Sequence, residues 1–227
     1  MKIVWIGQAG LYIEAGGLKI LVDPYLSDSV GKVNPKNARR VPVDESFLAI
    51  APDVIICTHD HLDHVDPETL PVYLGRGGRI LVLAPEAAWN TIRRNGGDHN
   101  YVKFNRRTQW TEGEVRFYAV RAEHSDPHPI GVIIEAEGKR LYITGDTLYH
   151  PDILEDVLPF APIDALFLPI NGVGNNMNMA DAARFCAAIR PRVAVPLHWG
   201  LFDALNGADW AYPDKVVPRF FEEIEIG

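Results

Sequence analysis

Cysteine is scarce in this sequence, and so are long hydrophobic runs. Among its 227 residues are 2 cysteines, Cys57 and Cys186, which lack the spacing of a disulfide framework or a thiolate metal site. We expect both to be buried as small hydrophobic side chains. No apolar run approaches the roughly 20 residues that cross a bilayer, and Gly7 interrupts the N-terminal apolar stretch before a signal-peptide core forms. These absences predict a cytoplasmic protein with no membrane partner.

Basic residues are also few. The 22 Lys and Arg are outnumbered by 30 Asp and Glu, so the formal net charge is −8. A nucleic-acid surface needs a basic face, and we therefore expect no nucleic-acid partner. With 47% hydrophobic and 23% charged residues, the chain is long enough for one large core, and we expect a single domain over residues 1–227. The expected partner is a small-molecule substrate, and a homo-oligomer is left open.

The densest chemical signal is the segment Thr58-His59-Asp60-His61-Leu62-Asp63-His64, which follows a short apolar run. Imidazole nitrogens and carboxylate oxygens are ligands that divalent ions such as zinc bind in near-tetrahedral sets. In an extended segment His59 and His61 would point to the same side and share one ion. If the chain turns there, Asp63 and His64 would diverge toward a second point. A loop held by Asx turns is the alternative, but five potential ligands in six residues at a strand end favour metal binding.

Three more residues of ligand type follow predicted strands further along the chain, namely His124, Asp146 and His198. A lone His beside a strand is more often a hydrogen-bonded structural residue than a ligand. Three such residues in this order, downstream of the His-rich segment, favour two neighbouring ion sites. The candidate ligands are His59, His61, Asp63, His64, His124, Asp146 and His198.

Strand and helix signals alternate along the chain. Strands are predicted at residues 3–6, 11–15, 19–22, 79–83, 115–120, 130–135, 140–144, 164–170 and 192–197. Helices are predicted at residues 67–73, 86–94, 152–158 and 179–189. This order indicates a layered α/β fold. The candidate ligands fall at strand ends along one rim.

Residues 25–52 show no alternation, so we expect a long loop, and long loops in compact domains are usually functional. This segment carries Lys32, Lys36, Arg39 and Arg40 in an otherwise acidic chain. One interpretation is a solvated face. The other is a lid whose cations bind a phosphate or carboxylate of the substrate, with Arg39 and Arg40 suited to a bidentate contact.

Two shorter segments are candidates for the wall of a pocket. Residues 171–177 are rich in Gly and Asn and follow a predicted strand, which favours an irregular loop beside the site. Trp199 comes directly after the candidate ligand His198 and is a candidate substrate contact.

The order HxHxDH, then His, Asp and His, resembles the metallo-β-lactamase superfamily of metal-dependent hydrolases. The resemblance extends over nearly the whole chain. It implies that the layered α/β fold is an αββα sandwich, in which two facing mixed sheets have helices outside. Four segments are similar to the branch that contains L-ascorbate-6-phosphate lactonase: Gly7-Gln-Ala-Gly10, Ile20-Leu-Val-Asp-Pro-Tyr25, Gly145-Asp-Thr147 and Leu197-His-Trp-Gly200. By this resemblance Asp23 lies below the metal site, whereas its local sequence is equally compatible with an Asx turn.

The resemblance also assigns the candidate ligands to two ions. It implies one ion on His59, His61 and His124, and a second on Asp63, His64 and His198. Asp146 would bridge the two ions. A ligand set of His and Asp without thiolate favours zinc or manganese.

The expected chemistry is hydrolysis by a hydroxide held between two ions, with Asp63 both binding metal and orienting or deprotonating the attacking water. The expected enzyme is a lactonase that acts on an anionic, phosphorylated sugar lactone. A metal-dependent phosphodiesterase or nuclease of the same fold is the alternative enzyme, because the same hydroxide attacks phosphorus. A metal-binding domain without catalysis is the alternative outside enzymes, and the complete ligand set argues against it.

Overall fold

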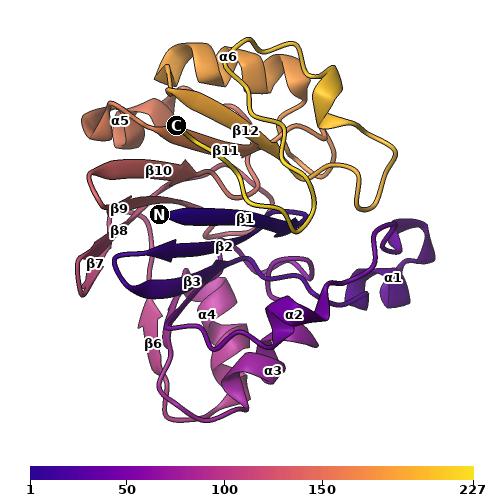
Figure 1. Ribbon diagram of the computed structural model, residues 1–227, viewed down its shortest axis with the longest axis vertical. Coiled ribbons are helices and arrows are strands. Elements are labelled where there is room, and N and C mark those ends of the chain that lie inside the picture. The colour runs from indigo at the N-terminus through magenta and orange to yellow at the C-terminus, as the bar shows by residue number, and fades with distance from the viewer.

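The computed structural model describes residues 1–227 and has four layers, in the order helix, sheet, sheet, helix (Figure 1). Two six-stranded sheets have the strand orders β1-β2-β3-β4-β5-β6 and β12-β11-β10-β9-β8-β7. Helices cover the outer face of each sheet, above and below the strands in Figure 1. The predicted αββα sandwich is therefore confirmed.

The first sheet combines an antiparallel start with a parallel continuation. Its strands are β1 (Lys2–Gly7), β2 (Gly10–Ala15), β3 (Leu18–Val22), β4 (Val54–Ile56), β5 (Leu81–Ala84) and β6 (Asn100–Lys103). Strands β1 to β3 pair antiparallel, and β3 to β6 run parallel. Gly16 and Gly17 both have positive φ in the tight turn between β2 and β3, a conformation that glycine adopts without steric cost.

The second sheet repeats this plan in the other half of the chain. Its strands are β7 (Gln109–Glu112), β8 (Val115–Arg121), β9 (Ile130–Ala136), β10 (Lys139–Ile143), β11 (Ala165–Pro169) and β12 (Val193–Leu197). Strands β7 to β10 pair antiparallel, and β10 to β12 run parallel. Strands β9 and β10 form a hairpin, with Glu137 and Gly138 at its turn.

The helices are short except for the last one. They are α1 (Ser29–Val33), α2 (Glu45–Leu48), α3 (Thr69–Leu74), α4 (Glu86–Ile92), α5 (Asp152–Val157) and α6 (Met179–Ile189). The side chain of Asn178 accepts hydrogen bonds from the first turn of α6, and Arg190 ends the helix with a left-handed φ of 55°. The predicted helix at residues 179–189 is present as α6, and its buried stripe of Ala182, Phe185, Cys186 and Ile189 packs on the second sheet.

The main core lies between the two sheets and includes Trp5, Ile13, Phe117 and Phe167. Two further clusters lie under the helices on the outer faces. The parallel strands are covered on both faces and therefore consist of nearly continuous apolar residues. None of the helices combines the length and the apolar composition that a membrane crossing needs.

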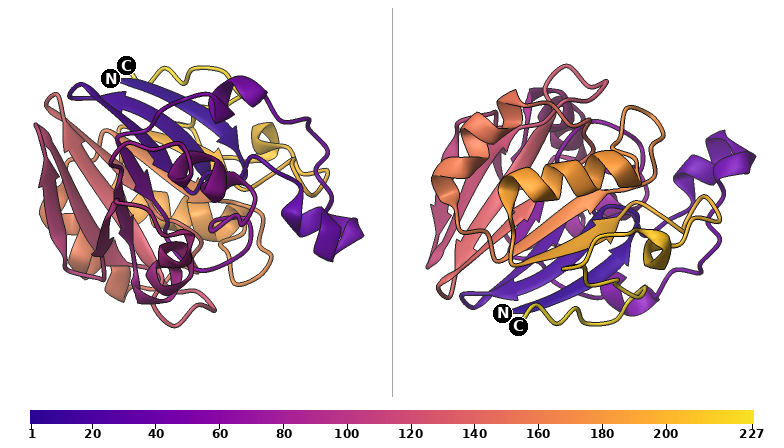
Figure 2. Two further views of the ribbon diagram at one scale, coloured as in Figure 1. Left: turned by 90° about the horizontal axis from the view of Figure 1, so that it is seen from below. Right: turned by 90° about the horizontal axis from the view of Figure 1, so that it is seen from above.

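This topology gathers several chain segments at one rim. Parallel strands end at a common edge, and the loops after β3, β4, β10 and β12 all leave from there. In Figure 2 the projecting helix α1 lies beside the same edge in both views. The rim therefore collects the His-rich segment, Asp146 and His198 from positions far apart in the sequence.

Two local predictions need correction. Residues 25–52 contain no strand but hold α1, α2 and a 3₁₀ turn at Pro35–Asn37, so the segment is more ordered than the predicted loop. The His-rich segment is not extended. Its backbone turns so that the N–H groups of His64 and Val65 both donate to the carbonyl of His61, at 3.0 and 2.8 Å. The backbone also bends at residues 59–61, so the contact between the His59 and His61 rings does not come from strand alternation.

Candidate metal centre

The base of the site is a buried carboxylate, Asp23, at the end of β3. Its Oδ1 accepts a hydrogen bond from the backbone N–H of Thr58 at 2.7 Å, and its Oδ2 accepts one from the Thr58 hydroxyl at 2.7 Å. The same Oδ2 lies 2.9 Å from Nδ1 of His64. With Nδ1 held by a carboxylate, Nε2 of His64 is left to face the site, which is the usual arrangement for a metal-binding histidine. Asp23 therefore lies below the site, as the resemblance implied.

Three imidazoles form the first group of candidate ligands. One nitrogen each from His59, His61 and His124 lies within 4.8 Å of the other two. Nδ1 of His61 is 3.1 Å from Nε2 of His124, a separation that suits two ligands of one ion. His124 follows the end of β8, and its Nδ1 faces the backbone carbonyl of Asn175 at 3.2 Å.

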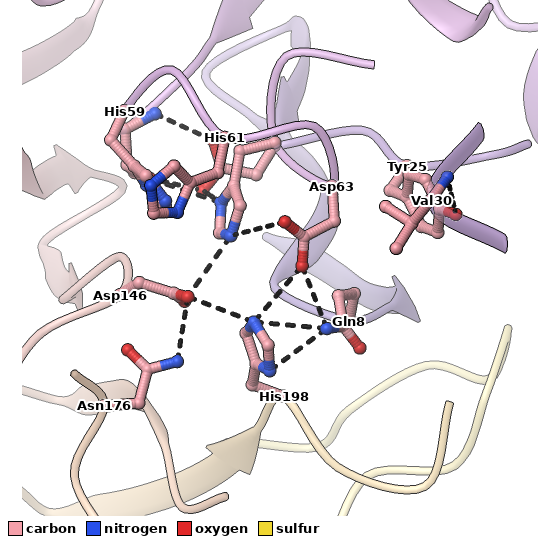
Figure 3. Close-up of polar contacts among 12 residues, drawn as sticks. Gln8, Tyr25, Val30, His59, His61, Asp63, Asp146, Asn176 and His198 are labelled. Atoms are coloured by element: carbon pink, nitrogen blue, oxygen red, sulfur yellow. Dashed lines mark hydrogen bonds and ion pairs between the residues drawn. The ribbon is translucent and has the colours of Figure 1, made fainter. Parts of the chain in front are cut away.

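The second group consists of Asp63, His64 and His198, again with one ligand atom each within 4.8 Å of the others. Asp146 lies between the groups, because its carboxylate also joins His59 and His64 in a third set of the same size. Figure 3 shows Asp63, Asp146 and His198 directed toward one another. Nε2 of His198 is 3.1 Å from Asp146 Oδ2 and 3.4 Å from Asp63 Oδ2.

Gly145 brings Asp146 close to the His-rich segment. It has a φ of +61°, and a Cβ atom at this position would lie 2.8 Å from the side chain of Thr58 and from the carbonyl of Ile130. Any larger residue would push the two loops apart.

Three buried ligand atoms lack a hydrogen-bond partner: His59 Nε2, His64 Nε2 and Asp146 Oδ1. An unpaired buried polar atom costs about 1 to 3 kcal/mol, so native proteins rarely leave several together. All three belong to one of the convergent sets. Divalent cations coordinated by these atoms would satisfy them, and a donor set of imidazoles and carboxylates is what zinc-type ions bind. The residues present therefore fit bound metal.

The electrostatics of the site also favour cations. Burial alone would lower the pKa of His64, but Asp146 and the other nearby carboxylates raise it well above its usual value. Burial opposes charge on His198 too, yet Asp146 and Asp63 raise its pKa to about 10. At His59 burial prevails, and the pKa falls well below the usual value. The carboxylates thus stabilise positive charge at the second group, which protons or metal ions can supply.

A cavity of about 320 Å³ opens beside the two groups. Its lining includes His61, Asp63, His124, Asp146 and His198, so five of the candidate ligands face it. The predicted pocket wall at residues 171–177 is confirmed, because that loop also lines the cavity.

Polar residues that sequence reasoning did not select contact the ligands. Gln8 is buried with a φ of 53°, and its Nε2 donates to Asp63 Oδ2 at 3.0 Å. Asn176 Nδ2 donates to Asp146 Oδ2 at 2.8 Å (Figure 3). The amide of Asn171 lies 2.9 Å from His198 Nδ1. The only sequence signal for these residues was their place in a quoted segment or a loop.

The residues predicted to contact the substrate lie outside the lining of the cavity. The Arg39 guanidinium donates to the backbone carbonyls of Tyr25 and Val41, at 2.9 and 3.1 Å. The Trp199 indole donates to the Pro196 carbonyl, and its ring packs at a tilt against Trp5. Neither Arg39 nor Trp199 lines the cavity, and their roles as substrate contacts stay predictions. Arg40 is exposed and outside the cavity lining, and its role stays a prediction.

Comparison with known proteins agrees with this geometry. The family model described as a β-lactamase superfamily domain matches residues 19–199. A UPF0173 protein of Pyrococcus furiosus is 31% identical over 206 residues, which cover 89% of this chain and 85% of that protein. The chain belongs to the metallo-β-lactamase superfamily, in its UPF0173 family.

Other matches agree with this assignment. A UPF0173 metal-dependent hydrolase of Staphylococcus aureus (strain bovine RF122 / ET3-1) is 27% identical over 231 residues, covering 95% of this chain and 93% of that one. Among solved structures, an isothiocyanate hydrolase from Delia radicum gut bacteria superposes with a TM-score of 0.77 at 20% identity, covering 99% of this chain and 98% of the other. At that identity the likeness shows the metallo-β-lactamase fold alone. None of the relatives named here is an L-ascorbate-6-phosphate lactonase, so that finer resemblance stays a prediction.

Proposed function

We propose that this member of the UPF0173 metal-dependent hydrolases cleaves a small lactone or related ester, with two divalent ions, zinc or manganese, in the centre described above. The observation that carries the proposal is the convergence of seven ligand-type residues from four separate loops, with three buried ligand atoms left unpaired. One ion would be held by His59, His61 and His124, and the other by Asp63, His64 and His198. Asp146 would contact both.

Divalent ions in such a centre supply Lewis acidity, which activates water near neutral pH and polarises the oxygen under attack. The protein's own residues supply position and proton transfer. Gln8 holds Asp63 by its Oδ2, which leaves Asp63 Oδ1 to accept a proton from the attacking water. The new bond joins the water oxygen to the carbonyl carbon, and the ring C–O bond breaks. The proton on Asp63 then passes to the alkoxide that remains attached to the opened product.

Two features of the cavity favour a carbonyl substrate over a nucleic acid or another phosphodiester. The cavity is small, about 320 Å³, and no Lys or Arg side chain lines it. Recognition of a phosphodiester backbone relies on such side chains.

The alternative of a metal-binding domain without catalysis is disfavoured because five candidate ligands face an open cavity instead of being enclosed by protein. The cavity would also admit other small electrophiles, so an isothiocyanate belongs in any substrate screen.

A metal-resolved activity screen tests the proposal. The chain is purified without chelator, its metal content is measured, and samples loaded with zinc or manganese are assayed on lactones, aryl esters, an isothiocyanate and bis(p-nitrophenyl) phosphate. We expect about two ions per chain and turnover of a lactone or ester that exceeds turnover of the phosphodiester. The reverse order of activities would favour the phosphodiesterase. Full metal loading without turnover of any of these substrates would favour the binding domain.

A further inference from the structure

Two side-chain hydroxyls contact the imidazoles of the first group of candidate ligands. The Thr58 hydroxyl lies 3.1 Å from Nδ1 of His59, and the Ser125 hydroxyl lies 3.3 Å from Nε2 of His61. A metal-binding histidine usually donates the N–H of its second ring nitrogen to a partner of this kind, which fixes the orientation of the ring. Each hydroxyl is therefore placed to hold one of the two imidazoles.

The nitrogen of His61 that faces the other ligands is Nδ1, because it lies 3.1 Å from Nε2 of His124. With Nδ1 directed at an ion, the ring proton is on Nε2. The Nε2–H group then donates to Ser125 Oγ, which accepts. A hydroxyl has one proton and two acceptor positions, so this bond leaves the Ser125 proton available for another acceptor.

The two hydroxyls differ in where their own protons are donated. Thr58 is buried, and its hydroxyl donates to the carboxylate of Asp23 at 2.7 Å. Ser125 Oγ has no hydrogen-bond partner other than His61, and Ser125 is an exposed residue in the lining of the cavity. The Ser125 hydroxyl is therefore a donor without a protein acceptor in the cavity where the proposed reaction takes place.

We infer that Ser125 is a further catalytic residue, which donates a hydrogen bond to the substrate oxygen that becomes negatively charged when water attacks the carbonyl carbon. This inference rests on the proposed function, which places a lactone or ester in the cavity. The water oxygen forms the new bond to carbon, and one electron pair of the C=O double bond moves onto the carbonyl oxygen. Ser125 keeps its proton throughout, so no bond of the serine breaks.

The position of His61 strengthens this donor. A hydroxyl that accepts a hydrogen bond is polarised by it and donates more strongly in turn. A donor directed at an oxygen that gains charge stabilises the transition state more than the bound substrate. Removing one such donor typically lowers kcat by about a hundredfold to a thousandfold. Ser125 is exposed to water, which screens the interaction, so we expect a smaller factor of about tenfold to a hundredfold.

Kinetics of the zinc-loaded protein provide the first part of the test. Ser125→Ala should lower kcat for a lactone by that factor and change KM less than threefold. Ser125→Thr retains a hydroxyl and should keep kcat within about fivefold of the unmodified protein. Ser46→Ala is the matched control, because it removes a serine hydroxyl on α2, outside the cavity lining. It should leave kcat and KM unchanged.

Binding of two inhibitors, measured by calorimetry, separates contact with the substrate from a structural role. A lactam has an uncharged planar carbonyl, whereas a cyclic phosphonate of the same ring size carries negative charge on tetrahedral oxygens, as the transition state does. Ser125→Ala should weaken phosphonate binding about tenfold and lactam binding less than threefold, because a hydrogen bond to a charged acceptor is the stronger one. Water can replace the exposed Ser125 as acceptor of the His61 proton, so the zinc content should not change.

Three results would overturn the inference. One is an unchanged kcat together with unchanged phosphonate binding in Ser125→Ala. Another is equal weakening of both inhibitors, and the third is loss of zinc from this variant, because Ser125 would then act only through the orientation of His61.

The inference and the proposed function fail in different ways. If neither lactone nor ester is hydrolysed but Ser125→Ala still weakens phosphonate binding, the proposed reaction falls and the contact of Ser125 with a charged oxygen stands. If lactones are hydrolysed and Ser125→Ala is as fast as the unmodified protein, the reaction stands and the role of Ser125 falls.

Discussion

Asn171 offers a sharp test of the second ion site, because its amide contacts the nitrogen of His198 that faces away from the other candidate ligands. Nε2 of His198 is the nitrogen that faces Asp63 and Asp146. An imidazole that binds an ion through Nε2 carries its proton on Nδ1 and needs an acceptor there. The amide of Asn171 lies 2.9 Å from that Nδ1, and its Oδ1 has no partner. Rotation of the amide by half a turn would bring Oδ1 to the Nδ1 proton.

Loss of this acceptor has a calculable cost. Removing a partner of a metal-binding histidine typically weakens metal binding by about tenfold to a hundredfold, or roughly 1.4 to 2.7 kcal/mol. We therefore expect Asn171→Ala to weaken binding of one of the two ions by that factor. Asn171→Asp retains an acceptor for Nδ1 and is expected to bind within about threefold of the unmodified protein, since the required hydrogen bond is kept.

Metal affinity is measured by competition with a chromophoric chelator, one ion at a time. The ¹⁵N spectrum of the zinc-loaded protein reports the His198 tautomer independently of activity. Asn90→Ala, an exposed change on α4, is the control and should leave both readouts unchanged. If Asn171→Ala binds two ions as tightly as the unmodified protein, or if the Asp variant is as weak as the Ala variant, Asn171 does not hold the Nδ1 proton.

Three further predictions concern the metals and stability. Asp146→Ala removes the ligand shared by both groups. We expect this variant to hold less than one metal ion per chain and to show no detectable hydrolysis, while its circular dichroism spectrum stays native. Unchanged turnover would refute the shared role of Asp146. Arg39→Ala should lower the free energy of unfolding by about 2 to 4 kcal/mol, because the backbone carbonyls of Tyr25 and Val41 lose a charged donor; urea unfolding measures this. The same variant should change KM less than twofold in steady-state kinetics. Asp156→Asn should cost about 1 to 2 kcal/mol at neutral pH, since a hydrogen bond from Arg106 lowers the Asp156 pKa. This difference should shrink as pH falls through the depressed pKa, because the native carboxylate then becomes protonated, and a constant difference from pH 7 to acid would contradict the ion pair.

The layers of the fold were predictable because local signals agreed with one another. Apolar runs and turn residues indicated the same elements, and most ends differ from prediction by one or two residues. Residues 25–52 were less predictable. A count of their charges showed that cations were present but not that Lys32 turns to Glu68 and Arg39 to backbone carbonyls. The direction of a long side chain depends on tertiary partners that no local pattern encodes.

The candidate ligands could be predicted from the sequence, whereas the residues that support them could not. His and Asp crowded into one short segment are rare outside metal sites, so composition alone selected that segment. Gln8, Asn171 and Ser125 are single polar residues on separate loops, and each becomes significant only when folding brings it to a ligand or to the cavity. Sequence therefore indicated the class of chemistry at this rim. The amide side chains of Gln8, Asn171 and Asn176 that contact the ligands emerged only from the arrangement of the loops around the cavity.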